Sequence, residues 1–446
     1  TTLDAYLNPI LTRYVAKTWS QFGGQRSCRL RLMTSAGNLV APAAFRGRDS
    51  ILSGPAGGVV ALAAVTQQAG ADAAIGLDMG GTSTDVSRFE GRMGRRYESE
   101  VAGVHIMTPM MDIHTVAAGG GSICGYRHGR FHVGPDSAGA DPGPACYGRG
   151  GPLTITDVNL LLGRIPAARF PLPLDRDAAR SRLLEIVDRA RREGHTVESA
   201  ETIADGFLQI AVTHMAEAVR QVSTAEGTDP RVMTLVGFGG AAGQHLCRIA
   251  DGLQMRRILD HPHAGMLSAL GMGLASIGHV VTRGVYQRLD ASCLNLIVKV
   301  ADELKQDAAQ QLTREQPDSR VQPQFDVECD LRYDGADSPL SLALSPPATL
   351  AERFHQQHRT TFGYDQTDRA IELVCVRCDA TIAANYQLAQ PTPSVAPEPR
   401  TTIRMWCHAR WTEVDVNERA SMATGQVVAG HSMIVCDYST LLVEPN

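Results

Sequence analysis

A two-glycine turn between two β-prone runs is the feature that most constrains this chain. Residues 73–79 form an apolar run, Gly80 and Gly81 follow it, and a second β-prone run begins at Thr84. Glycine has no Cβ, so it accepts tight turns and lets backbone N–H groups come close to a ligand. The spacing predicts a β-hairpin, which differs from the strand–loop–helix order of a Walker A or dinucleotide-binding segment.

The residues of this turn predict a phosphate site. Hydroxyls of Thr82, Ser83 and Thr84 add donors to the backbone N–H groups, and Asp78 and Asp85 flank the turn. Successive backbone N–H groups can form a concavity that binds anions. Two carboxylates beside a phosphate make sense when a cation neutralises both, and Mg²⁺ binds one or two carboxylates together with phosphate oxygens. We therefore expect these two aspartates to be catalytic and to organise Mg²⁺ beside the phosphates of ATP. The structural alternative is a tight hairpin with a capping aspartate.

A second glycine cluster, GGAAGQH, occupies residues 239–245 between a predicted buried strand and a predicted helix. Small residues at the start of a helix let a nucleotide approach the backbone. We expect the adenosine side of the site to be lined by Gly239, Gly240, Ala241 and Gly243. His245 is a candidate for contact with the substrate or the nucleotide, and the alternative is that it caps the helix.

A triple glycine lies in the loop-rich stretch of residues 117–152. So long a Gly/Pro-rich run inside a compact domain is usually functional or disordered. Backbone donors here would hold a substrate or the γ-phosphate, and the alternative is a tight turn without a ligand. The residues of this candidate substrate loop are Gly119, Gly120, Gly121 and Ser122.

Asp112 and His114 raise the question of a metal site. Their i, i+2 spacing puts both side chains on one face of a strand. However, the 14 histidines are spread along the chain, and none of their spacings matches a standard zinc pattern. The sequence leaves open whether this pair binds a metal.

Composition and charge argue against several classes of protein. The 446 residues carry a formal net charge of -5, which gives no basic surface for nucleic acid. The longest apolar candidate, residues 264–277, is broken by glycine and too short to cross a bilayer. The ten cysteines are scattered, as in reduced cytosolic proteins, and the N-terminus lacks the features of a signal peptide. We expect a cytoplasmic protein that binds neither nucleic acid nor a membrane.

Changes in pattern along the chain predict four parts. Residues 1–285 have the alternation of strands and helices that is typical of an α/β domain. Residues 286–390 predict a smaller α+β domain, residues 391–400 a proline-rich linker, and residues 401–446 a β-rich tail.

The two glycine segments together resemble the second phosphate motif and the adenosine motif of the actin, Hsp70 and sugar-kinase superfamily. The resemblance implies a fold in which two RNase H-like halves close on ATP. The phosphate hairpin at residues 78–85 precedes the adenosine segment at residues 239–245, which is the order of the second half.

Four longer segments narrow the resemblance to the hydantoinase A/oxoprolinase family. They are SGPAGGV at 53–59, GLDMGGTSTDVS at 76–87, TVAAGGGS at 115–122 and GPACY at 143–147. Three further details resemble the oxoprolinase branch, and they are Gln244 before His245, LRYDGAD at 331–337 and DYSTLLVEP at 437–445. The resemblance covers essentially the whole chain.

The resemblance implies an enzyme that uses ATP and Mg²⁺ to open a cyclic amide. In the oxoprolinase branch this reaction converts 5-oxo-L-proline to L-glutamate, with ADP and phosphate, through a phosphorylated lactam. The family's first phosphate motif is expected upstream of Thr1, and a hydantoinase B-like half is expected on the same chain or on a partner subunit. We therefore expect the chain to be inactive alone and to work in a homo- or hetero-oligomer.

Three alternatives remain open from the sequence. The first is an ATP-dependent hydantoinase of the N-methylhydantoinase type, with the same chemistry on another ring. The second is a subunit of an ATP-using ketone carboxylase. The third is a non-catalytic assembly subunit that keeps the fold. The residues that contact the substrate ring are not identifiable from the sequence.

Overall fold

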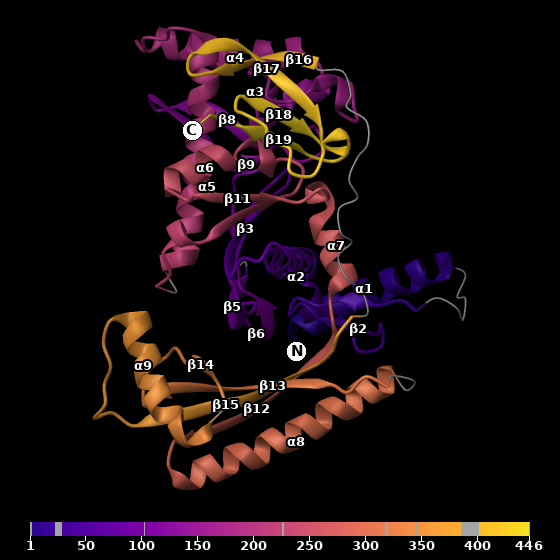
Figure 1. Cartoon of the computed structure of the whole chain (residues 1–446), viewed down its shortest axis with the longest axis vertical. Coiled ribbons are helices and arrows are strands. Elements are labelled where there is room, and N and C mark those ends of the chain that lie inside the picture. Colours follow the sequence, from indigo (N-terminus) through magenta and orange to yellow (C-terminus); the bar gives the residue numbers. More distant parts are fainter. Residues whose placement is uncertain are drawn as a thin grey trace.

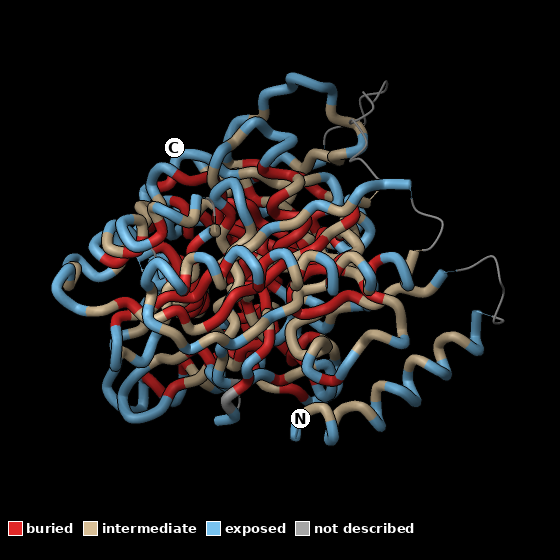
Figure 2. Tube along the Cα trace, turned by 90° about the horizontal axis from the view of Figure 1, so that it is seen from below, coloured by how far each residue is buried: buried red, intermediate tan, exposed pale blue. Residues whose placement is uncertain are grey.

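The computed structural model of the chain describes residues 2–22, 29–101, 103–224, 227–316, 320–344, 346–384 and 401–445. Figure 1 shows a central α/β core, an α+β body at one end and a small β-sheet at the other. Buried residues concentrate in the interior of these bodies, and exposed residues follow their outer helices and loops (Figure 2). The predicted proline-rich linker at 391–400 lies outside the described residues.

The core is built on a five-stranded sheet in the order β11-β10-β3-β4-β7. Three of its strands form an antiparallel meander, namely β3 (Ala73–Met79), β4 (Thr84–Glu90) and β7 (Ile113–Val116). The other two run parallel to β3, and they are β10 (Thr234–Phe238) and β11 (Arg257–Asp260). An antiparallel meander extended by two parallel strands is the RNase H-like arrangement, so the predicted fold class is confirmed.

Helices cover both faces of this sheet. Successive side chains of a strand point to opposite faces, and here the side chains on both faces are apolar. On one face, Leu62 of α2 packs with Val236 and Phe238 of β10. On the other face, Ile75, Leu77 and Met79 of β3 pack into the largest hydrophobic cluster. The first face carries α2 (Ser53–Gln68) and α7 (Leu267–Leu274). The helices of the larger cluster are α3 (Ile155–Leu161), α4 (Arg176–Arg192), α5 (Ala200–Thr224) and α6 (Leu246–Leu253).

The strand next in sequence after the hairpin does not join the core sheet. It is β5 (Arg95–Val101), which pairs with β6 (Val104–Met111) in a separate two-stranded sheet. The strand that pairs with β4 is the four-residue β7. So short a strand gives little periodicity to detect. A further hairpin consists of β8 (Ser122–Arg127) and β9 (Arg130–Ser137).

The α+β body has a six-stranded sheet in the order β1-β2-β12-β15-β13-β14. Its strands are β1 (Leu32–Met33), β2 (Leu39–Val40), β12 (Ile277–Arg288), β13 (Gln324–Tyr333), β14 (Leu340–Ala343) and β15 (Ile371–Ile382). Its helices are α8 (Ala291–Glu315) and α9 (Leu350–Phe362). Since β12 crosses residue 285 and β1 and β2 come from the N-terminal part, this sheet joins segments on both sides of the predicted boundary. The division into domains stays a prediction.

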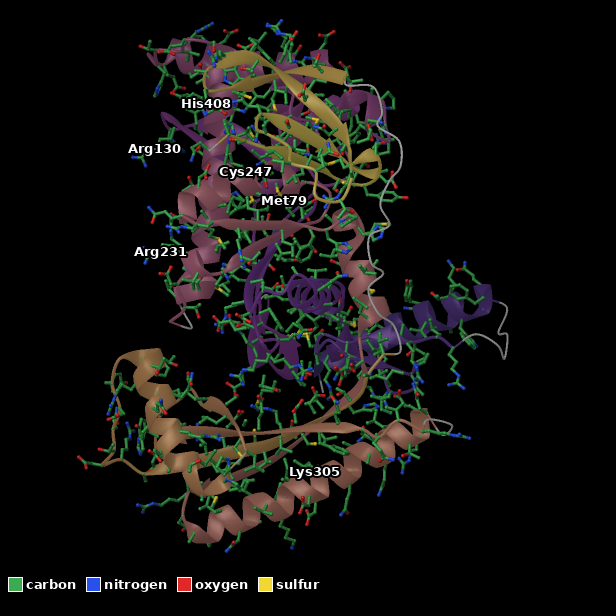
Figure 3. All side chains as sticks on the ribbon, in the orientation of Figure 1. Met79, Arg130, Arg231, Cys247, Lys305 and His408 are labelled. Atoms are coloured by element: carbon green, nitrogen blue, oxygen red, sulfur yellow. The ribbon has the colours of Figure 1, made fainter. Side chains whose placement is uncertain are left out.

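A four-stranded C-terminal sheet packs against the core. It consists of β16 (Thr401–Cys407), β17 (Arg410–Glu418), β18 (Ser432–Val435) and β19 (Thr440–Val443). Figure 3 shows, in descending order, His408 in the turn between β16 and β17, Cys247 on α6 and Met79 at the end of β3. The N–H group of Trp406 donates to the carbonyl of Leu162 at 2.9 Å, so the sheet extends the core at the end of α3.

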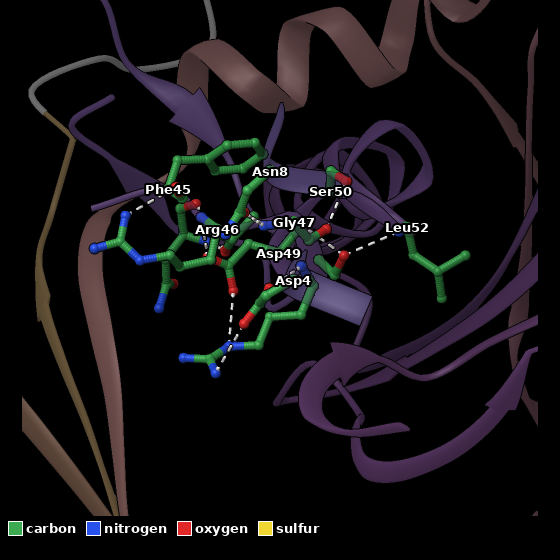
Figure 4. A network of polar contacts seen from close by, with 12 residues as sticks. Asp4, Asn8, Phe45, Arg46, Gly47, Asp49, Ser50 and Leu52 are labelled. Carbon is green, nitrogen blue, oxygen red and sulfur yellow. Dashed lines mark hydrogen bonds and ion pairs between the residues drawn. The ribbon is translucent and has the colours of Figure 1, made fainter. Parts of the chain in front are cut away.

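The first helix, α1 (Thr2–Gln21), has no buried residue and is held at one end by a polar network (Figure 4). The Asn8 carboxamide accepts from the N–H group of Gly47 at 2.7 Å, and Asp4 accepts from the N–H group of Arg48 at 2.9 Å. None of the described helices combines the length and apolar character needed to cross a membrane.

The close approach of α2 and α7 yields a prediction about stability. A Cβ on Gly271 of α7 would overlap the carbonyl oxygen of Gly57 on α2. We expect Gly271→Ala to lower the free energy of unfolding by about 1–3 kcal/mol, because the helices would have to move apart. Gly273 on the same helix is the control, since a Cβ there meets nothing within 4 Å. Urea unfolding of both variants checks this, and equal effects at the two positions would contradict it.

Candidate functional site

The predicted hairpin forms, and its tip is open. Asp78 and Asp85 lie opposite each other in the β3–β4 register, one pair before the turn. Gly80, Gly81 and Thr82 are exposed at the tip. The N–H group of Gly80 donates to the carbonyl of Ser83 at 3.1 Å and closes the turn. Within the described residues, the N–H groups of Gly81 and Thr82 make no hydrogen bond, so they are the donors available to an anion.

Two hydroxyl groups from distant elements hold the paired carboxylates. Ser268, in the first turn of α7, donates to Asp78 at 2.9 Å. Thr115 on β7 donates to Asp85 at 2.6 Å. The predicted donor Thr84 is buried, and its hydroxyl donates instead to the carbonyl of Ala118. The hydroxyls of Ser268 and Thr115 therefore hold the two carboxylates, and the hydroxyl of Thr84 ties the hairpin to the neighbouring loop.

Burial works against the ionised forms of both carboxylates. It raises the pKa of Asp78 above 3.8, the hydrogen bond from Ser268 opposes this, and the charge of Asp85 adds to it. The pKa of Asp85 is likewise raised by burial and lowered by Thr115. Two carboxylates that face each other with raised pKa values are stabilised by a cation between or beside them. The donor set therefore fits Mg²⁺, which prefers carboxylate and phosphate oxygens.

The triple glycine supports the hairpin from behind. The N–H groups of Gly120 and Gly121 donate to the carbonyls of Gly80 and Gly81 at 3.0 and 2.5 Å. A Cβ on Gly119 would lie 2.6 Å from the backbone nitrogen of Ser83. These glycines are buried, and close backbone packing accounts for their lack of side chains.

The backbone N–H groups of this loop, which were predicted to bind a substrate, already donate to groups of the chain itself. The N–H group of Gly119 donates to the buried hydroxyl of Ser122 at 2.8 Å. Thr156, at the start of α3, donates to the carbonyl of Gly120 at 2.8 Å and completes the support. The N–H groups of all three glycines therefore donate within the chain. Contact between a substrate and residues 119–122 stays a prediction.

The predicted adenosine segment lies beside Asp78. Gly239 has a φ of +84°, and a Cβ there would lie 2.6 Å from a carboxylate oxygen of Asp78. The N–H group of Ala241 donates to the carbonyl of Met79 at 3.2 Å, which ties this segment to the end of β3. Gly240 is exposed. Gly239 and Gly240 therefore border the carboxylate pair with bare backbone.

Gly243 has different surroundings from the other glycines of this segment. It is buried, and a Cβ there would overlap the carbonyl oxygen of Thr440 in the C-terminal sheet. Contact between Gly243 and a nucleotide stays a prediction, and this packing disfavours it.

His245 lies in the interior. It is 1% exposed, and its Nε2 lies 3.4 Å from the side-chain amide nitrogen of Asn159 on α3. Burial, with the charges of Arg164 and Arg248, lowers its pKa to about 3. The imidazole is therefore neutral at pH 7. Its side chain makes no capping hydrogen bond to α6, so the structure does not bear out the capping alternative.

Among the described residues, no metal-binding cluster forms around Asp112 and His114. Asp112 forms an ion pair with Arg96 at 2.5 Å. Across the part of the chain that the structure describes, three or more His, Cys, Asp or Glu side chains nowhere gather in a way that could hold a metal ion.

Sequence reasoning missed Ser268, and it gave Thr115 no role of its own. Thr115 lies opposite Asp85 in the β4–β7 register, so a correct placement of β7 would have found it. Ser268 is 190 residues from Asp78 along the chain, and no local pattern marks it.

Residues 1–280 match the family described as hydantoinase/oxoprolinase. The chain belongs to this family. It is 35% identical to 5-oxoprolinase PfmaA of Pestalotiopsis fici, over 99% of this chain and 36% of that protein. It is 33% identical to caprolactamase subunit alpha of Pseudomonas jessenii, over 100% of this chain and 67% of that subunit.

Solved structures agree with this membership. The crystal structure of the ATP-dependent caprolactamase from Pseudomonas jessenii superimposes with a TM-score of 0.83 at 30% identity, over 99% of this chain and 67% of that chain. A nucleotide-free acetone carboxylase shares the fold, with a TM-score of 0.72 at 20% identity over 94% of this chain and 62% of that chain. The chain spans about a third of the length of the first curated relatives; it covers 36% of the fungal 5-oxoprolinase, for example.

The raised pKa values yield a prediction about pH. Because the pKa of Asp78 is higher in the folded state than its ordinary 3.8, ionisation destabilises the fold as pH rises through the folded pKa, and the penalty is absent below 3.8. Asp78→Asn should therefore raise the thermal midpoint of the ligand-free protein at pH 7, and the gain should shrink towards pH 4. The control is Asp72→Asn, at an exposed position just before β3. A gain that is equal at both pH values would contradict this account.

Proposed function

We propose that this chain forms half of the ATP site of an enzyme that opens a cyclic amide, with 5-oxo-L-proline as substrate and L-glutamate as product. The observation that carries the proposal is the opposed pair Asp78 and Asp85 below an exposed glycine tip. Family membership supports the class of reaction. The name of the fungal relative, a 5-oxoprolinase, supports the substrate.

The chemistry explains the need for ATP. A lactam is a stabilised amide and a poor electrophile. Transfer of the γ-phosphoryl group forms a bond between phosphorus and the lactam oxygen, and ADP leaves. Water then adds to the ring carbon, the C–N bond breaks as nitrogen takes a proton, and a second water releases phosphate from the acyl phosphate. The enzyme must hold the γ-phosphoryl group in line and stabilise its charge.

Each part of the hairpin would have a separate task. The N–H groups of Gly81 and Thr82 would donate to phosphate oxygens, in the manner of other backbone anion sites. Mg²⁺, when bound by Asp78 and Asp85 directly or through water, would supply the positive charge that both the phosphates and the carboxylates lack. Gly239 and Gly240 would let the sugar and base approach the backbone.

The complete enzyme would need more than this chain. The relatives extend well beyond the matched region, and the caprolactamase relative is named as an alpha subunit. We propose that a first phosphate motif and a hydantoinase B-like half, on the same chain or on a partner subunit, complete the site, and that this chain alone does not turn over.

Caprolactam opening is the second candidate. It is favoured by the 33% identity to caprolactamase subunit alpha and by the close superposition on the caprolactamase structure. Both candidates use the same ATP chemistry on rings of different size, so the substrate dependence of ADP release separates them.

The test measures ADP release by the full-length protein with 5-oxo-L-proline, with caprolactam and without substrate. We expect ADP and glutamate in equal amounts with 5-oxo-L-proline. Asp78→Asn and Asp85→Asn should each reduce this rate about 100-fold or more, because the charge that organises the phosphates is lost. Asp72→Asn is the matched control and should keep the wild-type rate. Turnover that is independent of 5-oxo-L-proline, or unaffected by both site variants, would contradict the proposal.

A further inference from the structure

A turn of the C-terminal sheet lies on the predicted adenosine segment. The turn between β18 and β19 is closed by a hydrogen bond of 2.9 Å from the N–H group of Cys436 to the carbonyl of Ser439. The carbonyl oxygen of Tyr438 lies 3.8 Å from the position of a Cβ on Gly240. The same oxygen and the Cβ of Tyr438 pack on Gly265, which has no room for a side chain.

Side chains on both flanks fix this turn to the core. Arg419, just after β17, forms an ion pair with Asp260 at the end of β11. On the other flank, Glu444 accepts from Arg164 at 2.9 Å and lies 3.2 Å from Arg248. The Arg164 side chain is 1% exposed, so this pair lies in the interior. The sheet that carries the turn is therefore fixed to the core through Asp260 of β11, Arg248 of α6 and Arg164 in the loop after α3.

The ring of Tyr438 is left uncovered beside the site. The residue is 63% exposed, although an aromatic ring gains from burial. Gly240 is also exposed, and its neighbour Gly239 borders the carboxylate of Asp78. A short path of contacts therefore leads from the carboxylate pair, along bare glycine backbone, to an exposed aromatic side chain.

The packing also limits where a base could lie. Thr440 covers Gly243, so a nucleotide base cannot rest on that glycine. The backbone that stays open is that of Gly240, and the Tyr438 turn forms its border. A planar base that follows the phosphates along this backbone would reach the turn that carries Tyr438.

We infer that Tyr438 stacks on the adenine of ATP, so that the C-terminal sheet supplies part of the nucleotide site. The inference rests on the proposed function, because it takes ATP to bind with its phosphates at the hairpin tip. Aromatic rings bind bases through their faces and tolerate any base, so the tyrosine adds affinity for the nucleoside and leaves the phosphates to the hairpin.

The experiment compares ligands with and without a base. Binding of ADP and of inorganic tripolyphosphate to the full-length protein is measured by calorimetry for the wild type and for Tyr438→Ala. Alanine keeps the Cβ that packs on Gly265, so the turn stays in place. We expect the affinity for ADP to fall about tenfold, as for loss of one base–aromatic stack, and the affinity for tripolyphosphate to stay unchanged.

Two variants serve as controls. Tyr438→Phe keeps the ring and should bind ADP as the wild type does. Tyr286→Ala removes a tyrosine of similar exposure, 62%, in the α+β body and should leave both affinities unchanged. Unchanged ADP binding in Tyr438→Ala, or an equal loss for ADP and tripolyphosphate, would overturn the inference alone. A wild-type protein that binds neither ligand would overturn the proposed function as well.

Discussion

Contact between two stretches of glycine backbone underlies the candidate site. The hairpin tip at Gly80 and Gly81 rests on Gly120 and Gly121, whose N–H groups bind the carbonyls of the tip. The carbonyls of the tip are engaged on its buried side, whereas the N–H groups of Gly81 and Thr82 make no hydrogen bond within the described residues. A side chain on Gly119 would push the two stretches apart, because its Cβ would meet the backbone of the tip. The geometry of the proposed anion site thus depends on residues that would not touch the anion.

The hairpin was predictable because its signal is local. An apolar run, two glycines and a second β-prone run specify the turn, and the register then sets Asp78 opposite Asp85. The support of this hairpin was not predictable in the same way. Glycine density shows where backbone comes close to something, and it does not say whether that partner is a ligand or the chain itself. The loop at Gly119 is therefore a candidate for contact with a substrate or the γ-phosphate, and that contact stays a prediction; in the structure its N–H groups donate within the chain.

Contacts between distant segments account for the other features of the site that the sequence did not predict. Gly243 meets Thr440, and Ser268 meets Asp78, over separations of about 200 residues that no local pattern records. The resemblance implied an RNase H-like half, which the strand order of the core confirms, whereas β7 was too short to detect. The C-terminal sheet, expected only as a β-rich tail, proves to border the same glycines that were predicted to hold the adenosine. The candidate site is therefore bordered by the hairpin, α7 and the C-terminal sheet.

The most direct test of this account is a crystal structure of the full-length protein with Mg²⁺ and a non-hydrolysable ATP analogue. The account predicts phosphate oxygens within hydrogen-bonding distance of the N–H groups of Gly81 and Thr82, with Mg²⁺ bound by Asp78 or Asp85 directly or through one water. A nucleotide bound elsewhere, with the hairpin tip facing only solvent, would contradict it.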